Sequence, residues 1–176
     1  MTFVRFRIFC AILFAGSLAV MAPVHAGSKP PKVGFDKIAA RFKGGYQIVS
    51  PTGTLAGPAT VRVRSSAKGR AGQVEWRNTF YNARGSYTVV LRWKFLSNGT
   101  FTANSLDARK GSLPGRGTFK TSKARLIPFT GTSTNSLVSA VGSFETRGGG
   151  SLFITVTLTG PEEDPVTYSF SGSREH

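Results

Sequence analysis

Histidine and cysteine are almost missing from this sequence, and the few that it has are poorly placed for catalysis. The chain contains two histidines, His25 and His176, and one cysteine, Cys10. Cys10 and His25 fall within a predicted leader, and His176 is the last residue. The remaining chain therefore lacks the side chains for a Ser-His-Asp triad, a Cys-His pair or a histidine-rich metal site. We expect a protein that is not an enzyme and that uses no catalytic residue, metal or cofactor.

Acidic residues are also scarce, with 8 Asp and Glu against 23 Lys and Arg, which gives a formal charge of +15. Glu75, Asp107 and Glu145 are far apart in the sequence, and residues 162–164 form one acidic turn between prolines. Neither pattern favours the paired carboxylates of a hydrolase. The glycine run at 148–150 lacks the Lys-Ser/Thr ending and the helix of a phosphate-binding loop.

The first 26 residues are typical of a secretory signal peptide. Arg5 and Arg7 form a positive start, an apolar run follows over residues 8–21, and Ala26 supplies the small side chain that a signal peptidase requires. A membrane anchor is the alternative, but the apolar run is shorter than the roughly 20 residues needed to span a bilayer. We expect cleavage after Ala26 and a periplasmic or secreted protein.

Removal of residues 1–26 would leave 150 of the 176 residues and no cysteine. A chain of this length is typical of one domain with its own core. Because no disulfide is available, burial and backbone pairing have to stabilise it. We divide the sequence into the signal peptide 1–26, a Pro/Lys/Gly linker 27–34 and one β-barrel domain 35–176.

Apolar and polar residues alternate along most of this domain, and Gly, Asn and Pro interrupt the pattern. The alternation predicts about ten strands, preceded by a short helix over residues 35–42. The clearest strands are 46–50, 61–64, 74–81, 87–96, 100–106, 117–121, 125–131, 137–146, 152–159 and 166–171. Short turns such as Asn98-Gly99 make consecutive strands antiparallel neighbours. We predict an all-β fold with a single antiparallel up-and-down barrel, because closure removes the exposed edges of such a meander.

Each strand has one apolar face, and several have a basic face opposite to it. In residues 61–64 the two valines share one face and the two arginines the other. Neighbouring strands would gather five such side chains in one stripe, namely Arg62, Arg64, Arg77, Arg92 and Lys94. In a soluble barrel this stripe meets water, whereas in a small outer-membrane barrel it fills the lumen. The soluble arrangement is favoured, because few acids are available to pair with arginines in a narrow lumen.

Two short features add a family resemblance to this architecture. Gly44-Gly45-Tyr46 lies at the predicted opening of the first strand, and Arg174 lies near the last strand. The chain thus resembles the lipocalin-like, or calycin, barrels, which often have Gly-x-Trp in the first strand and an Arg that covers its ring. Tyr46 stands where those families often have Trp. The resemblance implies a ligand cavity inside the barrel, without naming a ligand.

Aromatic residues on the apolar faces are the candidates for such a cavity, because small-molecule sites are mostly apolar. The candidate ligand-binding residues are Tyr46, Trp76, Tyr87, Trp93, Phe95, Phe101, Phe119 and Phe129. An ordinary filled core is the alternative for each of them. Our leading hypothesis is an exported, non-enzymatic binding protein that holds a small apolar or amphiphilic ligand.

Positive charge is concentrated in one part of the chain and supports a rival hypothesis. Residues 37–125 contain 17 basic residues against Glu75 and Asp107, whereas residues 126–176 carry a net charge of −3. A strongly positive surface attracts polyanions such as an anionic membrane surface or an acidic partner. Nucleic acid is not expected as a partner, because export separates the protein from it. The alternative is a solvated surface without a binding role.

Overall fold

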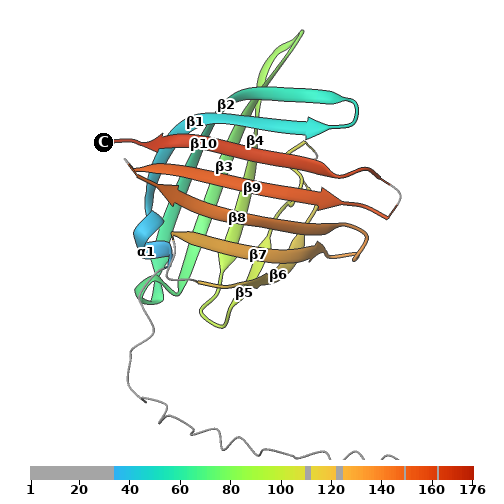
Figure 1. The fold of residues 1–176 in the computed structure, drawn as a ribbon. Helices are drawn as coiled ribbons and strands as arrows, with labels where there is room; N and C mark the ends of the chain where they lie inside the picture. Colours follow the sequence, from blue (N-terminus) through green and yellow to red (C-terminus); the bar gives the residue numbers. More distant parts are fainter. Residues whose placement is uncertain (1–33, 110–111, 122–124, 149, 162) are drawn as a thin grey trace, which may run out of the picture.

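The structure, a computed structural model, describes residues 34–176 except 110–111, 122–124, 149 and 162 (Figure 1). The predicted signal peptide and residues 27–33 of the linker lie outside the described residues. One α-helix, α1 (Phe35–Ile38), and one 3₁₀ turn, η1 (Ala67–Gly69), accompany the strands. The strands are β1 (Ala40–Ser50), β2 (Gly53–Ser66), β3 (Ala71–Asn82), β4 (Gly85–Phe95), β5 (Thr100–Ala103), β6 (Gly115–Phe119), β7 (Leu126–Ser133), β8 (Ser139–Arg147), β9 (Ser151–Thr159) and β10 (Val166–Arg174).

The ten strands form one closed antiparallel barrel in which each strand pairs with its neighbours in the sequence. The first and last strands close the barrel, with Phe42 opposite Arg174 and Val49 opposite Thr167. The predicted all-β, up-and-down barrel is thereby confirmed. Closure leaves no unpaired sheet edge between β1 and β10. Within the described residues, no helix has the length and apolar character that crossing a membrane would require.

The predicted helix is shorter than expected. It was predicted to reach Phe42, but α1 ends at Ile38 and β1 begins at Ala40. Phe42 also fits the period-two set that continues through Tyr46, and the pairing of β1 with both β2 and β10 favours the strand. Phe35 is fully buried and lies against Gly72, where an added Cβ would come within 2.4 Å of its ring. The helix therefore packs against one end of the barrel, which we call the helix end.

Gly44 and Gly45 lie in the middle of β1, so the prediction that they open the first strand was wrong. A Cβ on Gly44 would lie 2.0 Å from the carbonyl oxygen of Ser171 on β10. Only glycine allows the two backbones to approach this closely. Glycine in this motif therefore serves strand packing, and Tyr46 lies opposite Phe170 in the register rather than opposite Arg174.

A segment between β5 and β6 enters the barrel from the end opposite to α1. Residues 105–108, which we call the plug segment, are all buried. Its Ser105 carbonyl accepts a hydrogen bond from Nε1 of Trp93 at 2.9 Å. The hydroxyl of Tyr168 donates to Oδ1 of Asp107 at 2.5 Å, although β10 stands on the opposite side of the barrel order from β5. The plug segment thus ties two distant parts of the wall together at what we call the plug end.

Asp107 remains ionised inside this end of the barrel because several donors surround it. Burial raises the pKa of its carboxyl, but hydrogen bonds from Arg109 and Tyr168 outweigh that effect and hold the pKa below its usual value. Arg109 donates from Nε at 3.3 Å and from Nη2 at 3.1 Å. Burial and the bond to Asp107 also raise the pKa of Tyr168. The pair Asp107–Tyr168 is therefore an anionic acceptor with a neutral phenol as its donor.

Candidate functional site

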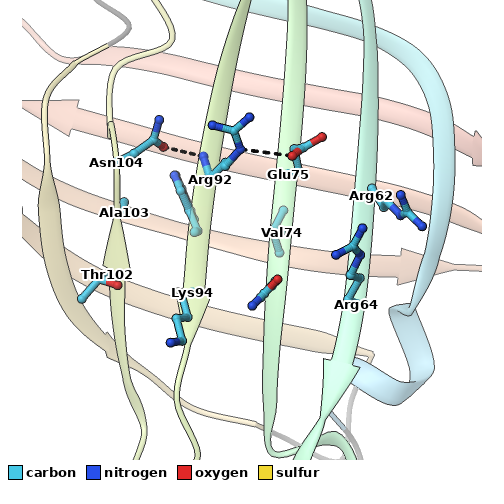
Figure 2. Close-up of a pocket in the computed structure, with 11 residues that line it drawn as sticks. Arg62, Arg64, Val74, Glu75, Arg92, Lys94, Thr102, Ala103 and Asn104 are labelled. Atoms are coloured by element: carbon cyan, nitrogen blue, oxygen red, sulfur yellow. Dashed lines mark hydrogen bonds and ion pairs between the residues drawn. The ribbon is translucent and has the colours of Figure 1, made fainter.

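The outer wall formed by β2, β3, β4 and β5 contains a groove of about 390 Å³. Arg62 and Arg64 come from β2, and Arg92 and Lys94 come from β4, with the carboxylate of Glu75 on β3 between them (Figure 2). The lining also includes the polar residues Gln73, Thr102 and Asn104, together with Val74, Trp93 and Ala103. We call this site the basic groove.

Strand register brings these side chains together. Arg62 lies opposite Glu75, which lies opposite Arg92, and the next row places Arg64, Gln73 and Lys94 side by side. Because side chains alternate between the two faces of a strand, all of these positions face outward while their neighbours Val63, Val74 and Trp93 are buried. Directly opposed side chains in neighbouring strands have Cβ atoms roughly 5 Å apart. Two adjacent rows therefore form one continuous charged surface.

The single carboxylate of the groove is already paired. Oε1 of Glu75 accepts a hydrogen bond from Nε of Arg77 at 2.8 Å, and Oε2 accepts one from Nε of Arg92 at 3.2 Å. The bond from Arg77 is the main cause that lowers the pKa of Glu75 below its usual value, and Arg92 adds to it. Glu75 is thus ionised at neutral pH, and its charge is shared between Arg77 and Arg92.

Three cations of the groove keep their charge uncompensated. Among the described residues, Arg62, Arg64 and Lys94 have no carboxylate within ion-pair distance, in contrast to Arg92. The lining carries four cationic side chains and one carboxylate, so its formal charge is +3. All four cations are exposed, and within the described chain Arg62, Arg64 and Lys94 can move toward a ligand without breaking an ion pair.

Asn104 fixes one rim of the groove. Strand β5 ends at Ala103, but the Asn104 amide donates to the Arg92 carbonyl at 3.0 Å, and its Nδ2 donates to the Val90 carbonyl at 3.0 Å. Its Oδ1 accepts a hydrogen bond from the backbone amide of Arg92 (Figure 2). The Asn104 side chain therefore replaces the missing strand pairing beside Arg92. Sequence reasoning missed this role, because no short-range pattern marks it.

Only four of the five residues of the predicted basic stripe line one groove. Arg62, Arg64, Arg92 and Lys94 line the groove, whereas Arg77 lies in an adjacent hollow with Arg41 and Thr60. Gln73 was overlooked, although it shares the outward face of β3 with Glu75 and Arg77 and could have been found from that alternation.

The predicted aromatic ligand-binding residues separate into two groups. Five of them form one cluster with Phe35 and Phe144, with ring centroids between 4.8 and 6.5 Å apart. This helix-end cluster consists of Phe35, Trp93, Phe95, Phe101, Phe119, Phe129 and Phe144. The ring of Phe101 lies over Gly117 and Gly131, where an added Cβ would come within 2.7 Å of it. The rings pack on one another and on backbone, as in a filled core.

Tyr46 and Tyr87 belong to a second group nearer the plug end. Both rings contact Phe80, with centroid distances of 4.9 Å and 5.3 Å. Tyr46 is buried, whereas Tyr87 is about half exposed at 49 %. Trp76 lies between the two groups, and its ring centroid is 6.2 Å from that of Phe170. The eight predicted residues therefore do not line one common pocket.

Comparison with known proteins adds no family to these observations. No protein-family model matches the chain, and no curated protein matches it. Among the described residues, no group of three or more His, Cys, Asp or Glu is placed to hold a metal ion.

Proposed function

We propose that this protein is an exported, non-enzymatic, lipocalin-like binding protein that docks on an anionic membrane surface through the basic groove. The observation that carries the proposal is the group of three uncompensated cations, Arg62, Arg64 and Lys94, on one wall of a rigid barrel. Exposed charges that serve only solubility need no such gathering in one groove.

The chemistry of the groove suits phosphate-bearing headgroups. Arg presents planar, bidentate donors to phosphate, and Lys adds a compact point charge. The side chains of Gln73, Thr102 and Asn104 lie in the same groove and offer neutral hydrogen bonds. Each basic residue near an anionic membrane surface contributes about 1 kcal/mol of attraction. The groove residues together therefore supply enough free energy for reversible docking.

A membrane surface is favoured over a small anion because the positive region extends beyond the groove. Arg41 and Arg77 lie in the adjacent hollow, and Arg116 on β6 pairs with Thr102 at the other side. A wide positive wall matches an extended array of headgroups better than a single ion. The outward position of these arginines also favours this function over that of a small outer-membrane barrel, which turns an apolar band to lipid.

The test compares two triple variants that remove the same amount of charge. Arg62→Gln, Arg64→Gln and Lys94→Gln remove charge from the groove, whereas Arg84→Gln, Lys120→Gln and Arg174→Gln remove it from exposed positions elsewhere. Sedimentation with vesicles of phosphatidylglycerol and phosphatidylcholine measures binding at low and high salt. We expect the groove variant to bind roughly 30- to 100-fold more weakly than wild type, and the control variant to lose less than about threefold.

A variant with the opposite sign completes the test. Glu75→Gln removes the only carboxylate of the groove and frees Arg92, so we expect binding to phosphatidylglycerol vesicles to tighten by about threefold. Equal losses in both triple variants would show that net charge alone is responsible. Absence of vesicle binding by wild type would reject the membrane partner and leave an acidic protein as the candidate.

A further inference from the structure

We infer that the outer wall continues the basic groove into a site for a glycolipid headgroup whose sugar unit carries a phosphate at each end. The inference rests on the membrane docking proposed above and names the class of lipid that the wall selects. It assigns the phosphates and the sugar to different residues of the wall, so each part can be tested separately.

A second groove, of about 610 Å³, lies on the outer wall over β5, β6 and β7. Its outward-facing side chains are five threonines and one arginine, namely Thr100, Thr102, Arg116, Thr118, Thr130 and Thr132, and Phe101, Gly117 and Gly131 complete the lining. We call this site the threonine groove. Because Thr102 also lines the basic groove, the two grooves adjoin at β5.

One row of the strand register runs through both grooves and alternates in chemistry. From β2 to β7, the residues that face one another are Arg64, Gln73, Lys94, Thr102, Arg116 and Thr132, which we call the alternating row. All six are exposed, and Figure 2 shows Arg64, Lys94 and Thr102 on the outer wall. A cation therefore occurs on every second strand, with a neutral hydrogen-bonding side chain on the strand between.

The alternating row provides two separate positions for phosphate. Neighbouring strands lie about 4.8 Å apart, so the backbones of Lys94 and Arg116 are about 10 Å apart, with Thr102 between them. Lys94 belongs to the basic groove, whereas Arg116 lines only the threonine groove of the two. Within the described chain, neither cation forms an ion pair. Each of them can therefore receive an anion without giving up an existing partner.

The threonine groove suits sugar hydroxyls better than phosphate. A threonine hydroxyl both donates and accepts hydrogen bonds, as a sugar hydroxyl does, whereas an ionised phosphate oxygen only accepts. Oγ1 of Thr118 is 3.4 Å from Oγ1 of Thr130, which is longer than the usual 2.5–3.0 Å of such a bond. The two hydroxyls can therefore turn toward a ligand at little cost, and their methyl groups can contact the C–H groups of a sugar ring.

A solvated strand surface is the alternative, because threonine is common on exposed strands. The barrel offers a direct comparison on β9 and β10, where Thr157 lies opposite Thr167 with their Oγ1 atoms 3.2 Å apart. This second pair lines neither groove. If threonine served only strand formation, removal of either pair of hydroxyls should have the same effect on binding.

Vesicle binding with two different two-phosphate lipids tests the inference. Diphosphoryl lipid A carries a phosphate at each end of a glucosamine disaccharide, whereas cardiolipin joins its two phosphates through glycerol. Each is mixed into phosphatidylcholine vesicles at equal phosphate content, and binding is measured by sedimentation. We expect wild type to bind the lipid A vesicles about tenfold more tightly, because hydrogen bonds to the sugar add to a similar charge attraction.

Equal binding of the two lipids would overturn the inference and leave the membrane docking intact. Binding to neither of them, nor to phosphatidylglycerol, would reject the membrane docking itself.

Thr118→Val combined with Thr130→Val removes two hydroxyls and preserves side-chain size and strand preference. We expect this double variant to lower the preference for lipid A over cardiolipin to about twofold or less. Thr157→Val combined with Thr167→Val is the matched control and should retain the tenfold preference. A preference that persists in the first double variant, or that falls equally in both, would overturn the role of the threonine groove.

Arg116→Gln tests the second phosphate position. Wild type should bind diphosphoryl lipid A about fivefold more tightly than monophosphoryl lipid A, and Arg116→Gln should bind the two about equally. Arg84→Gln removes the same charge from the β3–β4 turn and should retain the fivefold difference. The assignment of Arg116 would be overturned if Arg116→Gln still distinguished the two lipids as wild type does.

Discussion

The interior of the barrel is filled in different ways at the helix end and at the plug end. At the helix end, seven aromatic rings pack on one another, on α1 and on glycines. At the plug end, a chain segment carrying the ionised Asp107 enters the barrel, and Asn78 lacks partners nearby on β3. Apolar packing stabilises without directional demands, whereas buried polar groups require specific partners. The difference teaches that the helix end depends on apolar packing, whereas the plug end depends on specific partners for its buried polar groups.

The largest effect is expected from breaking the helix-end cluster. Phe95 contacts six other rings of that cluster and is 1 % exposed. Phe95→Ala should lower the free energy of unfolding by about 3–5 kcal/mol, because it removes apolar contacts and leaves a cavity. Tyr87→Ala, at the plug end, should cost less than about 1 kcal/mol because Tyr87 is half exposed. Urea unfolding followed by circular dichroism measures both, and equal losses would contradict the division.

A smaller, pH-dependent effect is expected at the plug. The pKa of Asp107 is below its usual value in the folded protein, so its contribution is present above the unfolded pKa of about 3.9. That contribution is lost as the pH falls through the lower, folded pKa. Asp107→Asn should cost about 2 kcal/mol near neutral pH by weakening charge-assisted bonds. Its stability should also change less than that of wild type between pH 5 and acid unfolding.

Unfolding curves of wild type and Asp107→Asn at a series of pH values test this prediction. Parallel curves, with the same acid loss in both proteins, would show that Asp107 does not hold the plug segment through its charge.

The smallest effect on stability is expected from replacing Asn78, because its side chain has no hydrogen-bond partner to lose. Asn78→Leu should leave the free energy of unfolding unchanged or raise it by about 1 kcal/mol, since an unpaired buried amide is replaced by an apolar side chain. Ser105→Ala is the matched control, because its hydroxyl is bonded to the Asp107 carbonyl and to the Leu113 amide. Thermal unfolding should show a lower midpoint for Ser105→Ala only, and a comparable drop in Asn78→Leu would contradict our account of that residue.

The barrel and its basic face were predictable from local pattern. The Val-Arg alternation of residues 61–64 separates the inner from the outer face, and β2 retains that separation. On β9, the aromatic Phe153 lies on the polar, outward face, and the guanidinium carbon of Arg147 is 4.2 Å from its ring centroid. These features depend on residues close in the sequence, so the alternation of apolar and polar residues along each strand was sufficient to predict them.

The plug segment and the burial of Asn78 were not predicted, for two different reasons. The bond between Asp107 and Tyr168 joins residues 61 positions apart, and nothing local in residues 105–108 indicates entry into a barrel. Asn78 did carry a signal, since Trp76, Asn78 and Phe80 share the inward face of β3. Asn78 was nevertheless overlooked, because a polar residue between Arg77 and Thr79 suggests a solvent-exposed position. Only its position in the alternating pattern of β3 places it on the inward face.

The most direct test of the central claim, that the basic groove binds anionic headgroups, is side-chain NMR of arginine-labelled protein with bicelles. Bicelles containing phosphatidylglycerol should shift the Nε resonances of Arg62 and Arg64 in a saturable manner. The resonance of Arg147, which pairs with Glu145 on β8, should stay in place, as should all three with phosphatidylcholine alone. Unchanged resonances of Arg62 and Arg64 with phosphatidylglycerol, or equal shifts at Arg147, would contradict the account.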